Sequence, residues 1–327
     1  MKGKIGLEEH FAIDDTLMDS KGFFPEETWV EVRERIMDLH GRRLRLMDEF
    51  GMEIMILSLN APAIQAIPDP KRANEIARKA NDDLAEQVRK RPDRFQALAA
   101  LPLQDPDLAA KELQRCVKDL GMVGALANGF SQIGDPNTTA YLDEKQYWPF
   151  WGVVADLDVP FYLHPRNPLP QDARIYRDHG WLMGPTWAFG HETAVHALRL
   201  MGSGLFDRYP GLQVVIGHMG EGLPFSMWRV DNCNAWIANR HSYPAKKKIS
   251  EYFQANFHIT TSGNFHTPAL LNTMMVVGAD RILFSTDWPF ENIDHAALWF
   301  DAAPISEDDR LKIGRTNALK LFKLKGT

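Results

Sequence analysis

Four stretches of the sequence end in side chains that can bind a metal ion or move a proton. The first ends at Glu8-Glu9-His10, the second at His164, the third holds His218 and Glu221, and the last reaches Asp287. In each stretch the polar group follows a run of apolar residues. Imidazole nitrogens and carboxylate oxygens suit zinc or manganese, and a large share of oxygen favours manganese or iron. The same groups are also common general acids and bases.

The stretches belong to a pattern of short and long elements that alternate along the chain. Short, apolar, β-branched runs predict strands, and longer stretches with helical spacing predict helices between them. The predicted strands are Lys4 to Glu8, Glu53 to Leu59, Phe95 to Leu101, Val123 to Asn128, Val159 to His164, Gln213 to His218, His258 to Ser262 and Arg281 to Asp287. The helices include Arg72 to Lys90, Asp107 to Leu120, Thr193 to Ser203 and Pro224 to Ala238.

Strands that alternate with helices are typical of parallel βα units, and eight of them predict a (β/α)8 or TIM barrel. This fold needs about 250 residues before insertions, so we expect residues 1–327 to form one metal-dependent domain. An open doubly wound sheet is the competing fold, but it lacks a phosphate-binding glycine fingerprint here. The stretches Gly129 to Gln146 and Pro165 to Gly190 are expected as long loops on the rim.

The carboxyl ends of the strands of such a barrel meet at one face, where its catalytic groups lie. Glu8 and His10 are two residues apart, so they point the same way along an extended chain. An isolated histidine near a strand end is more often structural than a ligand. Here, however, candidates follow strands one, five, six and eight. We therefore expect the polar groups at these strand ends to form a metal site.

Composition limits the partners of the chain. Its 45% apolar and 24% charged residues are ordinary for a globular protein. The formal net charge of −6 disfavours nucleic acid, and no apolar run is long enough for a membrane span or a secretory signal. Cys116 and Cys233 are the two cysteines, which is typical of a reducing compartment. We expect a cytoplasmic protein that acts on a small molecule.

Several residues near the expected rim have two interpretations. Phe23, Asn128 and Phe290 are either ring and hydroxyl contacts of a substrate or residues that pack the loops. Arg229 is either a surface ion-pair partner or a ligand of a substrate carboxylate. A role for His258 or His266 beside strand seven is less favoured than packing. The histidines expected only to pack or to lie on the surface are His40, His179, His191, His196, His241 and His295.

The combination of these motifs resembles the decarboxylase branch of the amidohydrolase superfamily. The motifs are Glu8-x-His10, His164 after strand five, His218-x-Gly-Glu221, and Asp280-Arg-Ile-Leu-Phe-Ser-Thr-Asp-Trp-Pro289. Within that branch nearly the whole chain is similar to the γ-resorcylate (2,6-dihydroxybenzoate) decarboxylases. Supporting stretches are Phe161 to Gln171, Gly184 to Phe189 and Gly217 to Pro224.

The resemblance implies an amidohydrolase-like barrel and a reversible, non-oxidative decarboxylation of a hydroxybenzoate. Superfamily members with two metals carry a second histidine on strand one and a lysine on strand four. Here Glu8 replaces that histidine and Val123 to Asn128 holds no lysine, so one divalent metal is implied. Manganese is favoured over zinc, and no organic cofactor is expected. Glu8, His164 and Asp287 are the implied ligands, and His10 is a fourth ligand or a substrate contact.

The resemblance also assigns roles in the reaction. Asp287 is the implied acid, supported by His218 and Glu221. Substrate contacts are expected from His10, Phe23, Asn128, His164, His218, Arg229 and Phe290. A homotetramer is favoured, with the helix from Met227 to Trp236 as a candidate interface. The alternatives are a mononuclear lactone hydrolase, a decarboxylase of an amino-muconate, and a binding protein with a purely structural metal.

Overall fold

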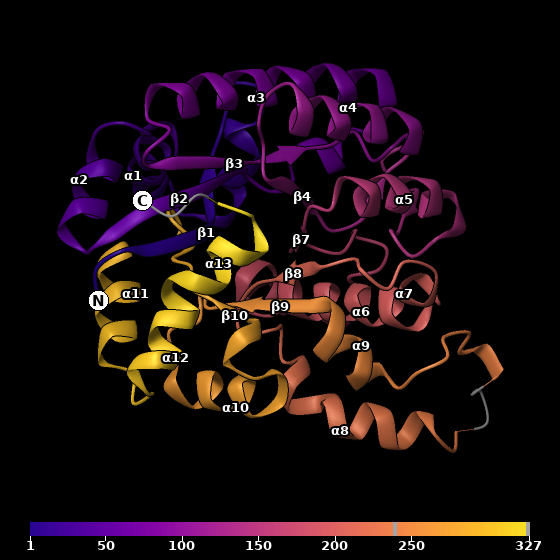
Figure 1. The fold of residues 1–327 in the computed structure, drawn as a ribbon. Helices are drawn as coiled ribbons and strands as arrows, with labels where there is room; N and C mark the ends of the chain where they lie inside the picture. The colour runs from indigo at the N-terminus through magenta and orange to yellow at the C-terminus, as the bar shows by residue number, and fades with distance from the viewer. Residues whose placement is uncertain (238–240, 325–327) are drawn as a thin grey trace.

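Eight parallel strands form one sheet whose first and last members meet. The computed structural model describes residues 1–237 and 241–324. The strand order is β1-β2-β3-β4-β7-β8-β9-β10 (Figure 1). The strands are β1 (Lys4–Phe11), β2 (Met52–Leu59), β3 (Phe95–Ala100), β4 (Gly124–Asn128), β7 (Phe161–His164), β8 (Val214–Ile216), β9 (Phe257–Thr260) and β10 (Ile282–Leu283). A parallel bridge between Leu7 and Ser285 closes the ring, so the predicted barrel is confirmed.

Helices surround the strands on the outside of the barrel. Figure 1 shows α3 and α4 along one side of the strands and α8 and α10 along the other. The helices are α1 (Glu26–Met37), α2 (Arg42–Glu49), α3 (Pro70–Lys90), α4 (Pro106–Lys118), α5 (Trp148–Leu157), α6 (Ala188–Gly202), α7 (Leu205–Arg208), α8 (Leu223–Asn234), α9 (Ile249–Asn256), α10 (Thr267–Val277), α11 (Ile293–Ala302), α12 (Glu307–Leu311) and α13 (Asn317–Leu321). The four helices predicted from spacing are all present, although Ala238, the predicted end of α8, lies outside the described residues. Among the described residues, no helix has both the length and the apolar composition needed to cross a bilayer.

The helix starts follow from local chemistry. Asp105 caps α4 by accepting hydrogen bonds from the backbone N–H groups of Asp107 and Leu108, and Pro106 occupies the first turn. Proline is tolerated there because its missing N–H has no partner in a first turn. Asp69 and Pro70 start α3 in the same way. The helix predicted from Asp107 is therefore present, and it begins one residue earlier, at Pro106.

Buried apolar residues form two main layers. The larger layer fills the space between the strands and the helices. The smaller layer fills the barrel interior below the site, with Ile5, Leu7, Ile54, Ile56, Leu98, Leu126, Tyr162, Val215 and Leu283 among its members. A barrel interior packed in this way leaves no pore. The polar side chains of the site lie directly above this smaller apolar layer.

A bulge in β1 determines which side chains face the interior. Gly6 lies opposite Met55 and Glu9 lies opposite Leu57, so three residues of β1 match two of β2. The backbone of Glu8 has φ of 57°, outside the strand region. Simple alternation from Leu7 would turn Glu9 into the barrel. The extra residue shifts that phase, and Glu8 turns inward instead.

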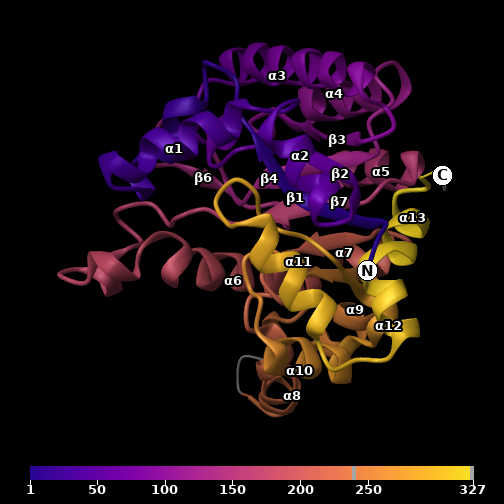
Figure 2. The ribbon, with the colours of Figure 1, turned by 90° about the vertical axis from the view of Figure 1, so that its left-hand side faces the viewer.

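The two predicted rim loops contain short ordered segments. The first holds β5 (Ser131–Gln132) and β6 (Thr139–Ala140), which pair antiparallel. The second holds three 3₁₀ turns and ends as α6 begins. Figure 2 shows the chain between β7 and α6 extending beyond the strands, on the same side as α1.

Candidate metal centre and substrate pocket

The Glu8 carboxylate is the central group of the site. Its Oε1 lies 3.2 Å from Nε2 of His164 and 3.3 Å from Nε2 of His218. Its Oε2 accepts a hydrogen bond from the hydroxyl of Tyr162, which also lies 2.9 Å from Oγ1 of Thr260. One carboxylate oxygen is therefore held by the barrel interior, and the other faces two imidazoles.

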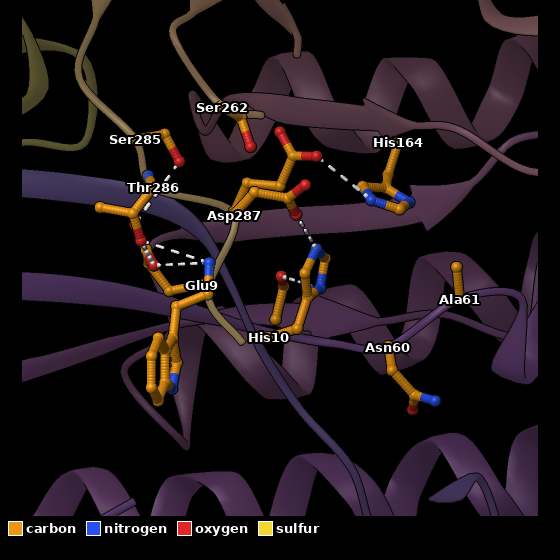
Figure 3. A network of polar contacts seen from close by, with 12 residues as sticks. Glu9, His10, Asn60, Ala61, His164, Ser262, Ser285, Thr286 and Asp287 are labelled. Carbon is orange, nitrogen blue, oxygen red and sulfur yellow. Dashed lines mark hydrogen bonds and ion pairs between the residues drawn. The ribbon is translucent and has the colours of Figure 1, made fainter. Parts of the chain in front are cut away.

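Asp287 approaches the same space from the turn after β10. Its Oδ1 lies 3.5 Å from Nε2 of His10, and its Oδ2 lies 3.9 Å from Nε2 of His218. Figure 3 shows Asp287 with its contact to His10 and with His164 nearby. The His10 and His164 rings meet edge to face, with centroids 4.8 Å apart. Residues that are far apart in the sequence thus converge at the carboxyl ends of strands, as predicted.

The unpaired atoms of this cluster fit a divalent cation. Oε1 of Glu8 and Nε2 of His10 are buried and have no hydrogen-bond partner of good geometry among the described residues. Such atoms are rare in folded proteins because each costs free energy. Two triads, Glu8 with His10 and His164, and Glu8 with His218 and Asp287, each have ligand atoms within 4.8 Å of one another. Mixed nitrogen and oxygen donors of this kind suit Mn²⁺ or Zn²⁺.

The electrostatics keep the carboxylates ionised. Burial raises the pKa of Glu8, but the charge of His218 and the contact with His164 outweigh it and leave the pKa lowered. Burial likewise opposes ionisation of Asp287, yet the nearby imidazoles of His10 and His218 hold its pKa well below the usual range. Burial lowers the pKa of His164, which favours the neutral imidazole that a metal ligand must be.

The carboxylate of Glu221 holds the His218 ring in place. Its Nδ1 lies 2.6 Å from Oε1 of Glu221, three residues along the chain. Burial lowers the pKa of His218, but the charges of Glu221 and Glu8 outweigh that effect and raise it well above its ordinary value. With Nδ1 occupied by Glu221, Nε2 is the nitrogen that faces the site.

Backbone strain is concentrated at the polar residues of the site. Glu8, His218, Glu221 and Asp287 have φ of 57°, 51°, 54° and 65°, the left-handed region that residues with side chains rarely adopt. Conformations of this kind cost free energy and persist only where the surrounding structure determines them. The strained backbone at these four residues therefore lowers the stability of the protein but orients their side chains toward the site.

Glycines leave the space that two of these side chains occupy. A Cβ at Gly217 would lie 2.6 Å from Oε2 of Glu8, closer than real Cβ contacts. A Cβ at Gly263 would lie 3.0 Å from both Asp287 and His218. The close approach of backbone to carboxylate explains why these two positions are glycine.

A cavity opens above the cluster. Its floor is formed by His164, His218 and Asp287, while most of its wall is aromatic or apolar. The lining residues are Ser20, Phe23, Phe24, Ala61, His164, Pro185, Phe189, His218, Asp287 and Phe290. A polar floor under aromatic walls suits a small planar acid. A larger hollow lies near residues 1–3 and 50–53, at the amino ends of the first two strands, and contains no site residue.

The structure brings most of the predicted site residues together. Glu8, His10, His164, His218, Glu221 and Asp287 form the cluster, and Phe23 and Phe290 line the cavity. Asn128 ends β4, but its amide donates to the backbone oxygens of Asn60 and Pro62 and it does not line the cavity.

Arg229 does not reach the cavity of its own chain. It is exposed on α8 and borders a separate hollow with Ser226, Cys233 and Trp236. Met227 is the buried residue of this turn, and a step of two residues turns a side chain by about 200° to the opposite face of a helix. The expected contact between Arg229 and the substrate is therefore not made within one chain.

Three supporting residues were missed from the sequence. Tyr162 shares the interior face of β7 with His164, because Phe161 and Leu163 belong to the outer layer. The sequence did carry a signal for Tyr162: it stands two residues before His164, so both side chains lie on the same face of the strand. Ser58, whose Oγ lies 3.3 Å from Nδ1 of His10, and Glu9 carried no comparable signal.

The remaining histidines lie outside the cluster. His196 and His258 are buried among packing contacts, and His258 lies 3.1 Å from Gln213 and 3.0 Å from Arg281. The exposed ones include His179, His191, His241 and His295. The prediction that these histidines pack or face solvent agrees with the structure.

Comparison with known proteins shows to which protein family the chain belongs. A family model described as amidohydrolase matches residues 15–324, and the chain belongs to the amidohydrolase family. The γ-resorcylate decarboxylase of Polaromonas sp. (strain JS666) is 67% identical over 324 residues, 99% of each chain. A crystal structure of 2,6-dihydroxybenzoate decarboxylase complexed with 2,6-dihydroxybenzoate has a TM-score of 0.97 and 66% identity, covering 99% of this chain and 100% of that one. A dihydroxybenzoic acid decarboxylase from Polaromonas sp. JS666, with bound manganese and the inhibitor 2-nitroresorcinol, also has a TM-score of 0.97, with 67% identity, covering 100% of this chain and 98% of that one.

Proposed function

We propose that this chain decarboxylates 2,6-dihydroxybenzoate to resorcinol and carbon dioxide, with one divalent metal ion. The observation that carries the proposal is the buried cluster of carboxylates and imidazoles on the floor of an aromatic-walled cavity. The high identity to γ-resorcylate decarboxylases over the full chain gives independent support. The reaction is a carboxy-lyase reaction of aromatic catabolism.

Four residues are proposed as the metal ligands: Glu8, His10, His164 and Asp287. The manganese in a relative with 67% identity supports Mn²⁺, with Zn²⁺ as the alternative. A bound divalent cation supplies positive charge that fixes the substrate carboxylate and an ortho oxygen and lowers the pKa of that hydroxyl. No organic cofactor is part of the proposal.

The ring carbon must gain a proton before carbon dioxide leaves, because otherwise an aryl anion results. Asp287 is the proposed donor, since its carboxylate lies on the cavity floor and would first take up the proton that it then passes to the ring carbon. His218 stands 3.9 Å from Oδ2 of Asp287 with its other nitrogen fixed by Glu221. That geometry supports a role in orienting the phenolic oxygen or in passing a proton to Asp287. Such proton-transfer groups typically contribute about 10²–10⁴-fold in rate.

The cavity wall supports binding of a flat ring. The Phe290 ring lies 5.4 Å from the His10 ring and 5.8 Å from the Phe24 ring. Phe23 meets Phe189 edge to face at 5.3 Å. Phe23 and Phe290 are thus proposed as substrate contacts. Asn128 stays a proposed hydroxyl contact because its buried Oδ1 has no partner among the described residues.

An exposed apolar face supports the proposed homotetramer. On α8, Phe225 and Trp228 are 87% and 75% exposed, and Trp236 follows the helix. Exposed aromatic residues grouped on one helix favour contact with another protein surface. Native mass spectrometry would measure the subunit count. Both cysteines are free thiols, in agreement with the proposed cytoplasmic location.

The test pairs elemental analysis of the purified protein with carbon dioxide release from 2,6-, 2,3- and 2,4-dihydroxybenzoate. We expect about one manganese or zinc per chain and the highest turnover on the 2,6-isomer. The reverse carboxylation of resorcinol is expected at high bicarbonate. Ordinary activity of metal-stripped protein would overturn the proposal, and so would full activity of His164→Ala.

The rival hydrolase has its own test. A mononuclear lactonase on the same barrel would open a pyrone lactone, which the decarboxylase would leave intact. An amino-muconate decarboxylase would release carbon dioxide from a non-aromatic acid but not from a dihydroxybenzoate. A protein with a purely structural metal would release none and would unfold on metal removal.

A further inference from the structure

Glu9 lies between two proposed ligands but makes its contacts on the other side of β1. Its Oε1 accepts a hydrogen bond of 2.9 Å from the backbone N–H of Thr286. Its Oε2 accepts one of 2.5 Å from the Thr286 hydroxyl and one of 3.3 Å from the backbone N–H of Trp288. Figure 3 shows Glu9 turned toward Thr286. The two residues that it holds flank Asp287 on either side.

This contact lies at the seam where the barrel closes. β10 is only two residues long, and a bridge between Leu7 and Ser285, two residues after β10, joins this segment to β1. Beyond the bulge, the N–H of His10 donates to the oxygen of Trp288 at 2.6 Å. The Glu9 carboxylate pairs the two N–H groups beside Asp287 where the regular ladder is interrupted. Buried N–H groups without a partner would be costly.

The surroundings of Glu9 suit a hydrogen-bond acceptor. The groups bonded to it are all donors, including the Ser285 hydroxyl at 3.5 Å from Oε1. A Cβ at Gly6 would lie 2.4 Å from Oε1, so glycine leaves the space for this carboxylate. Arg43, fully buried, donates to the backbone oxygen of His10 at 2.5 Å and places its charge near Glu9. A neutral amide in its place would turn an N–H group toward the backbone N–H of Thr286 or of Trp288.

We infer that Glu9 is a positioning residue: it fixes the turn that carries Asp287 against the strand that carries Glu8 and His10. The carboxylate thereby sets the distance between ligands from the first and last strands. This inference rests on the proposed metal site. It assigns Glu9 no contact with the substrate or the metal ion.

The test compares Glu9→Gln with Glu112→Gln. Glu112 is an equally buried carboxylate on α4 that accepts hydrogen bonds from Asn81 at 2.8 Å and Arg115 at 2.7 Å, away from the site. The measured quantities are the dissociation constant of Mn²⁺, by electron paramagnetic resonance of free Mn²⁺, and kcat and KM at saturating Mn²⁺. We expect Glu9→Gln to weaken Mn²⁺ binding about 10- to 100-fold, as for residues that orient metal ligands. Glu112→Gln should change Mn²⁺ binding less than twofold.

A folded Glu9→Gln variant with wild-type Mn²⁺ affinity would overturn the inference, as would an equal loss of affinity in Glu112→Gln. If Glu9→Gln does not fold, Thr286→Val removes one donor to the carboxylate and Thr286→Ser keeps it. Weakened Mn²⁺ binding in the valine variant alone supports the inference, and equal binding in both contradicts it. Failure of the proposed function would look different, because the wild-type protein itself would then bind no Mn²⁺ at this site or release no carbon dioxide.

Discussion

The Tyr162 hydroxyl donates a hydrogen bond to Oε2 of Glu8, while Oε1 of the same carboxylate faces His164 and His218. The barrel interior therefore restrains the rotation of the proposed ligand. Burial and the charge of Glu8 raise the pKa of Tyr162 well above its usual value, so the hydroxyl keeps its proton and remains a donor.

Removing that hydroxyl should loosen Glu8. We expect Tyr162→Phe to weaken Mn²⁺ binding about tenfold, because residues that orient ligands typically contribute that much. Mn²⁺ titration by isothermal calorimetry measures the change. The matched control is Tyr147→Phe, which removes a buried hydroxyl that donates to Leu103 O at 2.7 Å in the outer layer. Equal Mn²⁺ affinity in Tyr162→Phe and wild type would rule out the orienting role.

His218 should matter for turnover more than for metal content. We expect His218→Asn to lower kcat by about 10²–10⁴-fold, because the imidazole that faces Asp287 and the cavity is lost. Metal content should stay near that of the wild type. Stopped assays of carbon dioxide release and elemental analysis of the same preparation measure both. A parallel loss of metal and turnover would make His218 a structural residue instead.

Phe290 should affect substrate binding. Its ring lies on the cavity wall between His10 and Phe24. We expect Phe290→Ala to raise KM for 2,6-dihydroxybenzoate about tenfold, since a buried aromatic contact contributes about 1–3 kcal/mol. Initial rates over a range of substrate concentrations measure KM. The control is Leu298→Ala, which removes an exposed apolar side chain on α11. An unchanged KM in Phe290→Ala would exclude the ring from the binding surface.

The barrel could be predicted because its signals are local. Each strand is a short apolar run, and helices such as α3 and α4 have their own period and a capping aspartate, Asp69 or Asp105. The site residues could be predicted because parallel strands bring their carboxyl ends together. Once the strands had been identified, His164 and Asp287 could be predicted to lie at the same face of the barrel.

The geometry within the site could not be predicted because it depends on irregular backbone. The bulge at Glu8 shifts the alternation of β1, and no pattern in Leu7-Glu8-Glu9-His10 distinguishes one buried glutamate from the other. Glu9 differs from Glu8 only through contacts with Thr286 and Trp288, almost the whole chain away. For Arg229, the helix was predicted, but the face that it buries depends on how α8 packs.

A buried histidine outside the site gives a prediction about stability and pH. Nε2 of His196 accepts a hydrogen bond of 3.0 Å from the backbone N–H of Leu142, so this nitrogen carries no proton in the folded protein. Burial, with the charge of Arg199, lowers the pKa of His196 to about 3. In the unfolded chain the imidazole has an ordinary pKa of about 6.5. Between these values only the unfolded chain takes up the proton.

Protonation of the unfolded chain favours unfolding, so His196 makes the protein less stable as the pH falls below about 6.5, by up to about 1.4 kcal/mol per pH unit. Above that pH the residue has no such effect. We expect the melting temperature of the wild type to fall more steeply between pH 6.5 and 4.5 than that of His196→Gln, whose amide oxygen can still accept from Leu142. Circular dichroism melts at half-unit pH steps measure both slopes. His179→Gln, which removes an exposed imidazole, should keep the wild-type slope. Identical slopes for the wild type and His196→Gln would show that this histidine is protonated equally in the folded and unfolded chain.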